Sequence, residues 1–246
     1  MKTIDKALLE RFINKYHLAG AANSVLWAVE SGSLSTRFVS DDKHVLGEVK
    51  LEEFNQLEDD TKAGIFDTTL LKSMLTVLGK DIKLTYAKTG QKLTAIKLDD
   101  KSTKVTFVVS DEKVIPTVPN VKKLPDFELE LNINDAFANT FIRAKGALVD
   151  VDTFTVLSDG KKAPQVVIGY SSTHNTNRVT IEAETEDNVE LEAISFSGRY
   201  MKEILSANKE AESGALRVSS KGLAHVSFVI DGFEVEYYLV QIQTAD

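Results

Sequence analysis

The second half of this chain repeats the first half at a spacing of about 130 residues. The segment Ile65–Leu75 reads IFDTTLLKSML, the segment Ser195–Leu205 reads SFSGRYMKEIL, and Lys72 aligns with Lys202. Three strand-like runs follow each segment: Ile82–Tyr86, Leu93–Leu98 and Lys104–Ser110 in the first half, and Ala215–Val218, Ala224–Ile230 and Glu234–Val240 in the second. The repeat predicts two similar domains of roughly 120 residues each. Such a duplication suits a protein that makes the same contact several times better than an enzyme with one asymmetric pocket.

Composition allows each half to form its own core, because 43% of the 246 residues are hydrophobic. There is no cysteine, which excludes disulfides and thiolate chemistry and fits a reducing cytoplasm. The start of the chain lacks the apolar stretch of a signal peptide, and no later run reaches membrane-spanning length. We therefore expect a cytoplasmic protein without a membrane partner.

Helical periodicity predicts four helices. The first spans Ile4–Tyr16, the second begins near Asp67 or Thr68 and ends at Gly79, and the others span Asn134–Lys145 and Gly198–Ala207. In the second helix the expected buried residues are Leu70, Leu71, Met74, Leu75, Val77 and Leu78. Further strands are expected at Ser24–Glu30, Ser35–Ser40, Val45–Leu51, Phe127–Leu131, Thr153–Leu157, Gln165–Ser171, Val179–Glu184 and Val189–Phe196.

Two segments are expected to be irregular. Glu52–Gly64 reads as an acidic loop, and Asp111–Pro125 holds three of the four prolines and reads as a connector. The predicted domains are therefore residues 1–110 and 126–246, joined by residues 111–125. Two helices and many strands in each half predict an α+β fold, with both helices of a domain on one face of an antiparallel sheet.

The exposed faces of the four predicted helices are basic, although the whole chain carries a net charge of −8. Three acidic residues lie on these faces, namely Glu10, Asp135 and Glu203. The basic residues on them are Lys6, Arg11, Lys15, Lys72, Lys80, Arg143, Lys145, Arg199, Lys202 and Lys209. A basic face of this kind can bind DNA phosphates without reading the base sequence. Plain solvation is the alternative, since Lys and Arg favour helices and charged helix faces are often only surface.

Near the C-terminus, Val229–Val240 reads VIDGFEVEYYLV. Together with the duplicated domains, the basic helices, the proline-containing connector and the entry into the helix at Phe196–Leu205, this stretch resembles the ring-shaped DNA sliding clamps of the two-domain, trimeric type. Because the first helix is expected almost at Met1, with no strand before it, the layout is most similar to the clamps of T-even-type phages. The tail Gln241–Asp246 lacks the Pro-Lys pattern of cellular clamps.

The resemblance implies a homotrimer that closes head-to-tail into a ring of DNA-clamp domains. The ring would hold double-stranded DNA against the basic helix faces without sequence preference, would tether the replicative DNA polymerase, and would be opened by a clamp-loader ATPase. Subunits would join through edge strands at Thr103–Ser110 and Arg178–Glu184. The implied interface residues are Thr103, Val105, Phe107, Val179 and Ile181.

A pocket for a hydrophobic partner peptide is also implied by the resemblance. Its residues would be Val114, Ile115, Pro116, Val118, Leu239, Val240, Gln241 and Ile242. The alternative is that the apolar connector residues only cover the interface between the domains.

The sequence contains no recognisable catalytic motif. His17, His44, His174 and His225 are scattered without metal-ligand spacing, so neither a metal nor another cofactor is expected. Asp150 and Asp152 could share one side of a strand, but no third catalytic group accompanies them. Trp27 lies in an apolar run and is expected in the core. The sequence therefore favours a non-enzymatic viral clamp. The alternatives are an oligomeric, β-rich viral structural or scaffold protein and an enzyme with a site between its domains.

Overall fold

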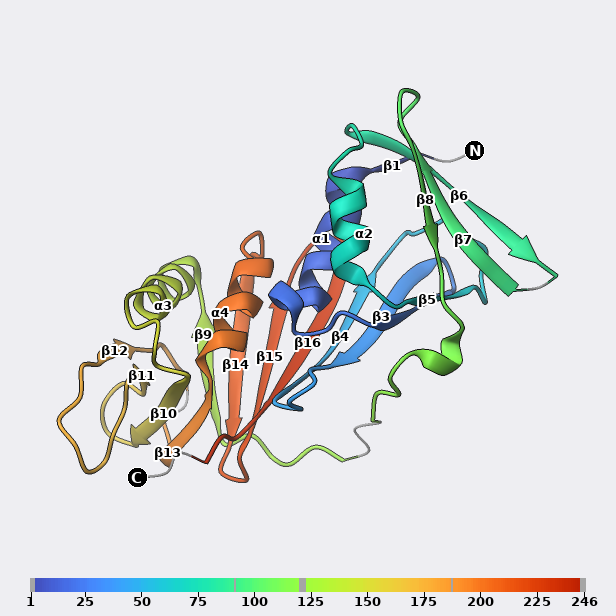
Figure 1. The fold of residues 1–246 in the computed structure, drawn as a ribbon. Coiled ribbons are helices and arrows are strands. Elements are labelled where there is room, and N and C mark those ends of the chain that lie inside the picture. The colour runs from blue at the N-terminus through green and yellow to red at the C-terminus, as the bar shows by residue number, and fades with distance from the viewer. Residues whose placement is uncertain (1–2, 91, 120–122, 187, 244–246) are drawn as a thin grey trace. The chain divides into compact units, whose positions relative to one another are not determined.

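The computed structural model describes residues 3–90, 92–119, 123–186 and 188–243 (Figure 1). Its contacts divide the chain into two compact units. The first comprises residues 3–41, 48–119 and 232–235, and the second comprises residues 42–47, 123–231 and 236–243. Part of the predicted connector and Thr244–Asp246 of the tail lie outside the described residues.

The first unit holds two helices and two groups of antiparallel strands. The helices are α1 (Lys6–His17) and α2 (Thr68–Leu75). One sheet has the order β1-β6-β7-β8, and its strands are Thr3–Asp5, Asp81–Thr89, Lys92–Asp99 and Lys104–Val108. The other has the order β5-β2-β3-β4, and its strands are Lys62–Ile65, Val25–Glu30, Ser33–Val39 and Val45–Leu51.

The second unit repeats this arrangement. Its helices are α3 (Asp135–Ala147) and α4 (Gly198–Ala207). One group of strands has the order β9-β14-β15-β16, namely Leu129–Ile133, Ser213–Ser219, Leu223–Val229 and Phe233–Val240. The other has the order β13-β10-β11-β12, namely Glu190–Ser197, Thr153–Asp159, Gln165–Ile168 and Val179–Glu182.

Within each unit the order strand, helix and three strands occurs twice. In the first unit β1 leads into α1 and β5 leads into α2, and each first strand pairs with the meander that follows the other helix. The second unit does the same with β9 and β13. The α+β fold class is confirmed. The sequence revealed only the longer repeat. The two halves of one unit have the same order of secondary structure, but too few of their residues match for the shorter repeat to be recognised.

The start of the chain differs from the prediction. Thr3–Asp5 forms β1 and pairs with Asp81–Lys83 of β6, so the prediction of a helix with no strand before it is wrong. The helix begins at Lys6 because the Asp5 side chain accepts a hydrogen bond from the Ala7 N–H at 2.9 Å and so caps it. Helical periodicity placed Ile4 on the buried face of the helix. Ile4 is indeed buried, but in strand β1.

Helix α2 ends at Leu75 and not at Gly79. The Lys6 ammonium donates to the carbonyl oxygens of Leu75 and Leu78, at 3.3 and 2.9 Å, and thereby satisfies groups that a longer helix would have paired. Its expected N-terminus is confirmed, since the Asp67 side chain accepts from the Leu70 N–H at 2.8 Å. The expected buried face was too wide: Leu70 is 50% exposed and Val77 is 59% exposed.

Strand β5 occupies the end of the segment that was expected to be an acidic loop, and it pairs with β2. Its sequence, KAGI, is too short and too rich in small residues to stand out as a strand. Gly64 allows a close approach here, because a Cβ at this position would lie 2.6 Å from the Ser110 carbonyl oxygen. Strand β9 starts at Leu129, two residues later than predicted.

Each unit has an aromatic core under its helices. In the first, Phe12 of α1 packs edge-to-face on Trp27 of β2, with ring centroids 5.6 Å apart, and the Trp27 N–H donates to the Tyr16 hydroxyl at 3.2 Å. Trp27 is 1% exposed, as the sequence predicted. In the second, Phe154 contacts Phe141 of α3 and Phe196 of β13. These cores fix the helices on their sheets and so determine which helix residues face outward.

Candidate nucleic-acid interface

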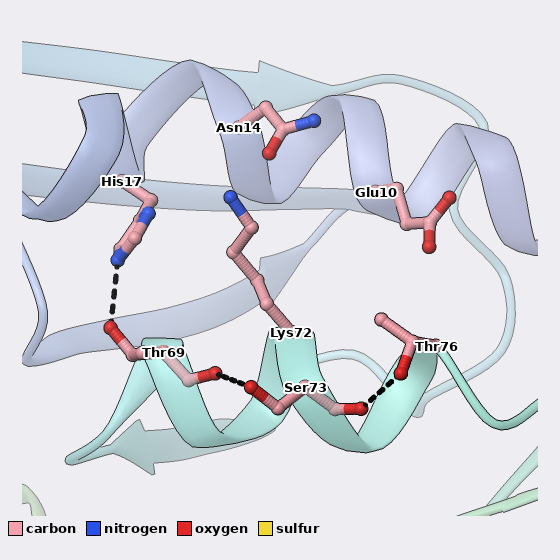
Figure 2. A pocket seen from close by; sticks show the side chains of 7 residues that line it. All are labelled: Glu10, Asn14, His17, Thr69, Lys72, Ser73 and Thr76. Atoms are coloured by element: carbon pink, nitrogen blue, oxygen red, sulfur yellow. Dashed lines mark hydrogen bonds between the residues drawn. The ribbon is translucent and has the colours of Figure 1, made fainter.

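A groove runs between α1 and α2 of the first unit, with a volume of about 460 Å³. Figure 2 shows Lys72 reaching from α2 toward α1, between His17 and Glu10. The residues that line this α1–α2 groove are Glu10, Asn14, His17, Thr69, Lys72, Ser73 and Thr76. Among these described residues Lys72 is the only one with a permanent positive charge, so an anion in the groove would be held through Lys72.

Two hydroxyl groups of the α1–α2 groove are already hydrogen-bonded to the helix backbone. Ser73 donates to the Thr69 carbonyl at 3.0 Å, and Thr76 donates to the Ser73 carbonyl at 2.7 Å (Figure 2). Their protons are used in these bonds, and their oxygens are left as acceptors. Neither hydroxyl therefore has a proton left to donate to an anion in the groove.

His17 closes one end of this groove and is 6% exposed. The Thr69 hydroxyl donates to the Asn23 side-chain oxygen at 3.0 Å, so His17 Nε2 is the donor in its 3.2 Å bond to Thr69 Oγ1. Burial, with a smaller contribution from the Lys72 charge, lowers the pKa of His17 to about 4. His17 is therefore neutral at physiological pH and supplies no charge for an anion.

Two of the ten basic residues predicted to face DNA are buried, and for them the prediction of an exposed position is wrong. Lys15 is fully buried, and its ammonium lies 5.0 Å from the centroid of the Phe233 ring. Lys145 is 8% exposed, and its ammonium donates to the carbonyl oxygens of Leu148 and Val149 just after α3. Periodicity assigned both lysines to an outer face because it does not take account of tertiary contacts. Lys15 packs against Phe233, which is distant in the sequence, and the Lys145 side chain turns back to cap its own helix.

The other basic residues keep exposed or half-exposed positions. On α1, Lys6 is engaged with α2 and lies 3.6 Å from Glu10, and the Arg11 guanidinium lies 4.9 Å from the Phe233 centroid. Lys72 is half-exposed. In the second unit Arg199 and Lys202 of α4 occupy one face, and Lys202 is the repeat counterpart of Lys72. Apart from Lys6, the exposed and half-exposed residues of the set are Arg11, Lys72, Lys80, Arg143, Arg199, Lys202 and Lys209.

The connector covers a second cavity, of about 600 Å³, on the β2–β3 surface of the first unit. Ile115, Pro116 and Val118 line it from the connector side, and the strand residues that line it include Leu26, Ala28, Ser35 and Arg37. Arg37 donates to the Pro119 carbonyl at 2.8 Å and so fixes the connector across the sheet. Val114 lies outside this cavity and is 56% exposed.

The predicted C-terminal part of the peptide pocket lies in the second unit. Leu239 is fully buried there, Val240 is 43% exposed, and the Ile242 N–H donates to the Ser195 carbonyl at 2.8 Å. Gln241 is exposed, and its N–H donates to the Gly222 carbonyl at 2.9 Å. Burial removes Leu239 from any surface pocket, because its side chain belongs to the core of its own unit.

Strands β8 and β12 are the last strands of their sheets among the strands that the structure describes. Each is the third strand after a helix in the order strand, helix and three strands. Val105, Phe107 and Ile181 point inward and are 8% exposed or less, so their side chains are core residues, whereas Thr103 and Val179 are half-exposed. The interface role of these five residues stays a prediction, since an edge strand pairs through its backbone groups. Val108 of β8 faces outward and is 73% exposed.

An apolar stripe along α2 and its two ends was missed in the sequence. Phe66 lies just before the helix, Leu70 lies in it and Val77 lies just after it, and they are 55%, 50% and 59% exposed. Helix α2 contacts β8, where Val108 is also exposed. The signal was present in the sequence, since too many apolar residues occur in this short helix for one buried face.

In the part of the chain that the structure describes, no three His, Cys, Asp or Glu side chains are grouped so as to hold a metal ion. No helix of the described residues is long and apolar enough to cross a membrane.

Comparison with known proteins identifies the fold. No protein-family model matches the sequence, and no curated protein matches it. Many solved structures match, among them three that cover nearly the whole chain. A proliferating cellular nuclear antigen (PCNA) from A. fulgidus, solved with the C-terminal region of FEN-1, has a TM-score of 0.76 at 14% identity and covers 99% of this chain and 98% of its own. The chain has the DNA-clamp fold.

Two further matches are also PCNA structures. The Entamoeba histolytica PCNA has a TM-score of 0.75 at 14% identity over 97% of this chain and 96% of its own. The PCNA2–PCNA3 complex of Sulfolobus tokodaii gives 0.73 at 12% identity over 97% of this chain and 98% of that one. At these identities the likeness establishes the clamp fold, and function rests on the surfaces described above.

Proposed function

We propose that this protein is a DNA sliding clamp, in which three copies form a ring around duplex DNA and tether the replicative DNA polymerase during synthesis. The observation that carries the proposal is the DNA-clamp fold, which extends over at least 97% of the chain in each comparison. The function is topological, and it needs no catalytic group. The role is therefore non-enzymatic.

Ring closure in this proposal uses β8 of one copy and β12 of the next. Each presents unpaired backbone groups at the edge of a sheet, and pairing them satisfies both edges at once. Outward-facing Val108 and the α2 stripe of Phe66, Leu70 and Val77 would be covered by the same contact. Because the two surfaces differ, the contact is head-to-tail, and it forms a closed ring when the rotation between copies is a third of a turn.

DNA would lie against the helix faces of both units. Lys72 and Lys202 occupy equivalent places in the repeat, so six such ammonium groups would recur around a trimer. Arg143, Arg199, Lys80 and Lys209 would add further phosphate contacts. Phosphate contacts carry no base-sequence information, which lets the duplex slide through the ring.

Partner proteins would bind at the connector cavity. In one structural match the C-terminal region of FEN-1 is bound to the A. fulgidus PCNA. By analogy, a short peptide from the polymerase or from a clamp-loader ATPase would place an apolar side chain among Leu26, Ala28 and Pro116.

The viral, phage-type specification loses its main support. It was based on a helix expected directly at the N-terminus, and β1 now precedes that helix. The proposal for a clamp does not depend on a viral source.

The absence of cysteine permits a direct test of encirclement. Cysteines introduced at Thr106 of β8 and Thr180 of β12, both exposed, can be joined between subunits by a flexible bis-maleimide. After cross-linking in the presence of nicked circular plasmid, we expect protein that stays with the DNA in denaturing detergent and is released when the plasmid is linearised. Either single-cysteine variant is the control. Equal recovery on linear and circular DNA would contradict encirclement.

A further inference from the structure

Arg199, one of the proposed phosphate contacts of the second unit, is held in a chain of polar contacts. Its Nη2 donates to the Tyr200 hydroxyl at 2.6 Å, and its guanidinium carbon lies 4.6 Å from the centroid of the Tyr200 ring. The Tyr200 hydroxyl in turn donates to Asp42 Oδ2 at 2.8 Å. The tyrosine, 3% exposed, thus connects an exposed cation to a carboxylate from a distant part of the sequence.

Asp42 is also within ion-pair range of Arg199 directly. Its Oδ2 lies 3.7 Å from Arg199 Nη2, and its Oδ1 accepts a hydrogen bond from the His44 N–H at 3.2 Å. Both Asp42 and Arg199 belong to the second unit. The Arg199 side chain is 66% exposed, so part of the guanidinium is open to a phosphate while its charge is partly balanced by the carboxylate.

A carboxylate beside a phosphate-binding guanidinium weakens phosphate binding in two ways. It satisfies part of the charge that would attract the phosphate, and it repels the phosphate itself. For a ring that must slide, weaker individual contacts are an advantage, because a strongly held phosphate would slow each step along the duplex.

We propose that Asp42 acts through Tyr200 as a positioning residue that fixes the orientation of Arg199 and limits the strength of its contact with DNA phosphates. The inference rests on the proposed clamp function. Asp42 lies in the turn between β3 and β4, so a residue outside the helices would adjust a phosphate contact made by α4.

The test compares two substitutions that remove the same charge from neighbouring positions. Asp42→Asn removes the negative charge and keeps one oxygen, which can still accept from the Tyr200 hydroxyl, while the amide NH2 takes the place of the oxygen that accepts from the His44 N–H. Asp41→Asn is the matched control, because Asp41 is exposed and is not part of the chain of contacts that joins Arg199, Tyr200 and Asp42. Both are made in the wild-type and in the Arg199→Gln background, and affinity for a labelled linear duplex is measured by fluorescence anisotropy across a salt series.

We expect Asp42→Asn to bind the duplex about two- to fivefold more tightly than Asp41→Asn, as expected for release of one exposed ion pair. The slope of log affinity against log salt should steepen by up to about 0.9, the value for one further phosphate contact. In the Arg199→Gln background the difference between the two substitutions should disappear. If Asp42→Asn lowers the melting temperature, Asp42→Ser is measured instead.

Equal affinities of the Asp42→Asn and Asp41→Asn variants would overturn the inference, as would a difference that persists without Arg199 or a loss of affinity in Asp42→Asn. Each of these results leaves the clamp proposal intact as long as wild-type protein binds the duplex in a salt-dependent way. Failure of wild-type protein to bind at any salt concentration would instead count against the proposed function itself.

Discussion

At the scale of single residues, the basic helix faces separate into side chains that hold the fold and side chains available to a ligand. Lys145 and Lys6 donate to backbone carbonyls at helix ends, and Lys15 is buried beside Phe233. Lys202 and Arg199 remain at the surface. A count of charges on a helical wheel cannot make this distinction, because it depends on where the end of each long side chain lies.

This division predicts opposite results for two lysines of the second unit. Lys145→Met keeps the aliphatic stem but removes the donor to Leu148 and Val149, so we expect the free energy of unfolding to fall by about 1 to 3 kcal/mol. The salt dependence of DNA binding should not change. In Lys202→Met we expect stability to change by less than about 0.5 kcal/mol and the salt slope to become shallower by about 0.9 for each phosphate that the side chain had neutralised. Denaturant unfolding and anisotropy measure the two quantities, and a shallower slope in Lys145→Met would contradict the assignment.

His17 makes stability depend on pH. Its pKa is lowered from 6.5 to about 4 in the folded protein, so the unfolded chain binds this proton more readily. The contribution of His17 is therefore complete above about pH 6.5, declines as the pH falls to about 4, and amounts to at most about 3 kcal/mol. His17→Gln, whose amide can still donate to Thr69, should flatten the stability curve in that window. Parallel curves for the two proteins in urea titrations would show that His17 does not titrate as described.

At the scale of elements, the edge strand β8 and the exposed stripe of α2 have no partner within the described chain that covers them. Val108 is 73% exposed and Phe66 is 55% exposed. Val108 is on β8 and Phe66 directly precedes α2, and these two elements contact each other. A protein that remained monomeric would expose these side chains to solvent, whereas the proposed ring covers them.

We therefore expect Val108→Asp to break the assembly while the chain stays folded, because a carboxylate would be buried without a counter-ion at the contact. Val229→Asp is the matched control: Val229 is 58% exposed on β15 and lies outside the proposed contact. Size-exclusion chromatography with circular dichroism measures both. Unchanged elution of Val108→Asp would exclude β8 from the interface.

Much of this element structure could be predicted from the sequence. Helix α4 and strand β4 have the predicted bounds. Strong helical periodicity and the capping residue Ser197 mark α4, and the alternation of apolar and polar residues marks β4. Strand β1 could not be predicted, because Ile4 is apolar in either a helix or a strand and only pairing with β6 decides between them. The α2 stripe was misassigned for a similar reason. Whether Leu70 and Val77 are core or surface depends on what covers the helix, and this is set by distant residues.

At the scale of the whole molecule, duplication explains how three copies of one chain could form a ring of six similar units. Each unit repeats a strand, a helix and three strands twice, so a trimer would contain twelve such modules and would present its helices in equivalent positions. The sequence revealed the twofold repeat through Lys72 and Lys202 and their neighbours, and the structure added the repeat inside each unit. The resemblance to clamps implied a partner pocket near Pro116, but the strand side of the cavity found there, including Leu26 and Arg37, came only from the fold.

The most direct test of the central claim is the mass of the protein in solution, measured by light scattering across a dilution series. The ring predicts a single species at three times the chain mass of 27.1 kDa that does not grow as the concentration rises. A strict monomer at high concentration, or a mass that increases without limit, would contradict a closed trimeric ring.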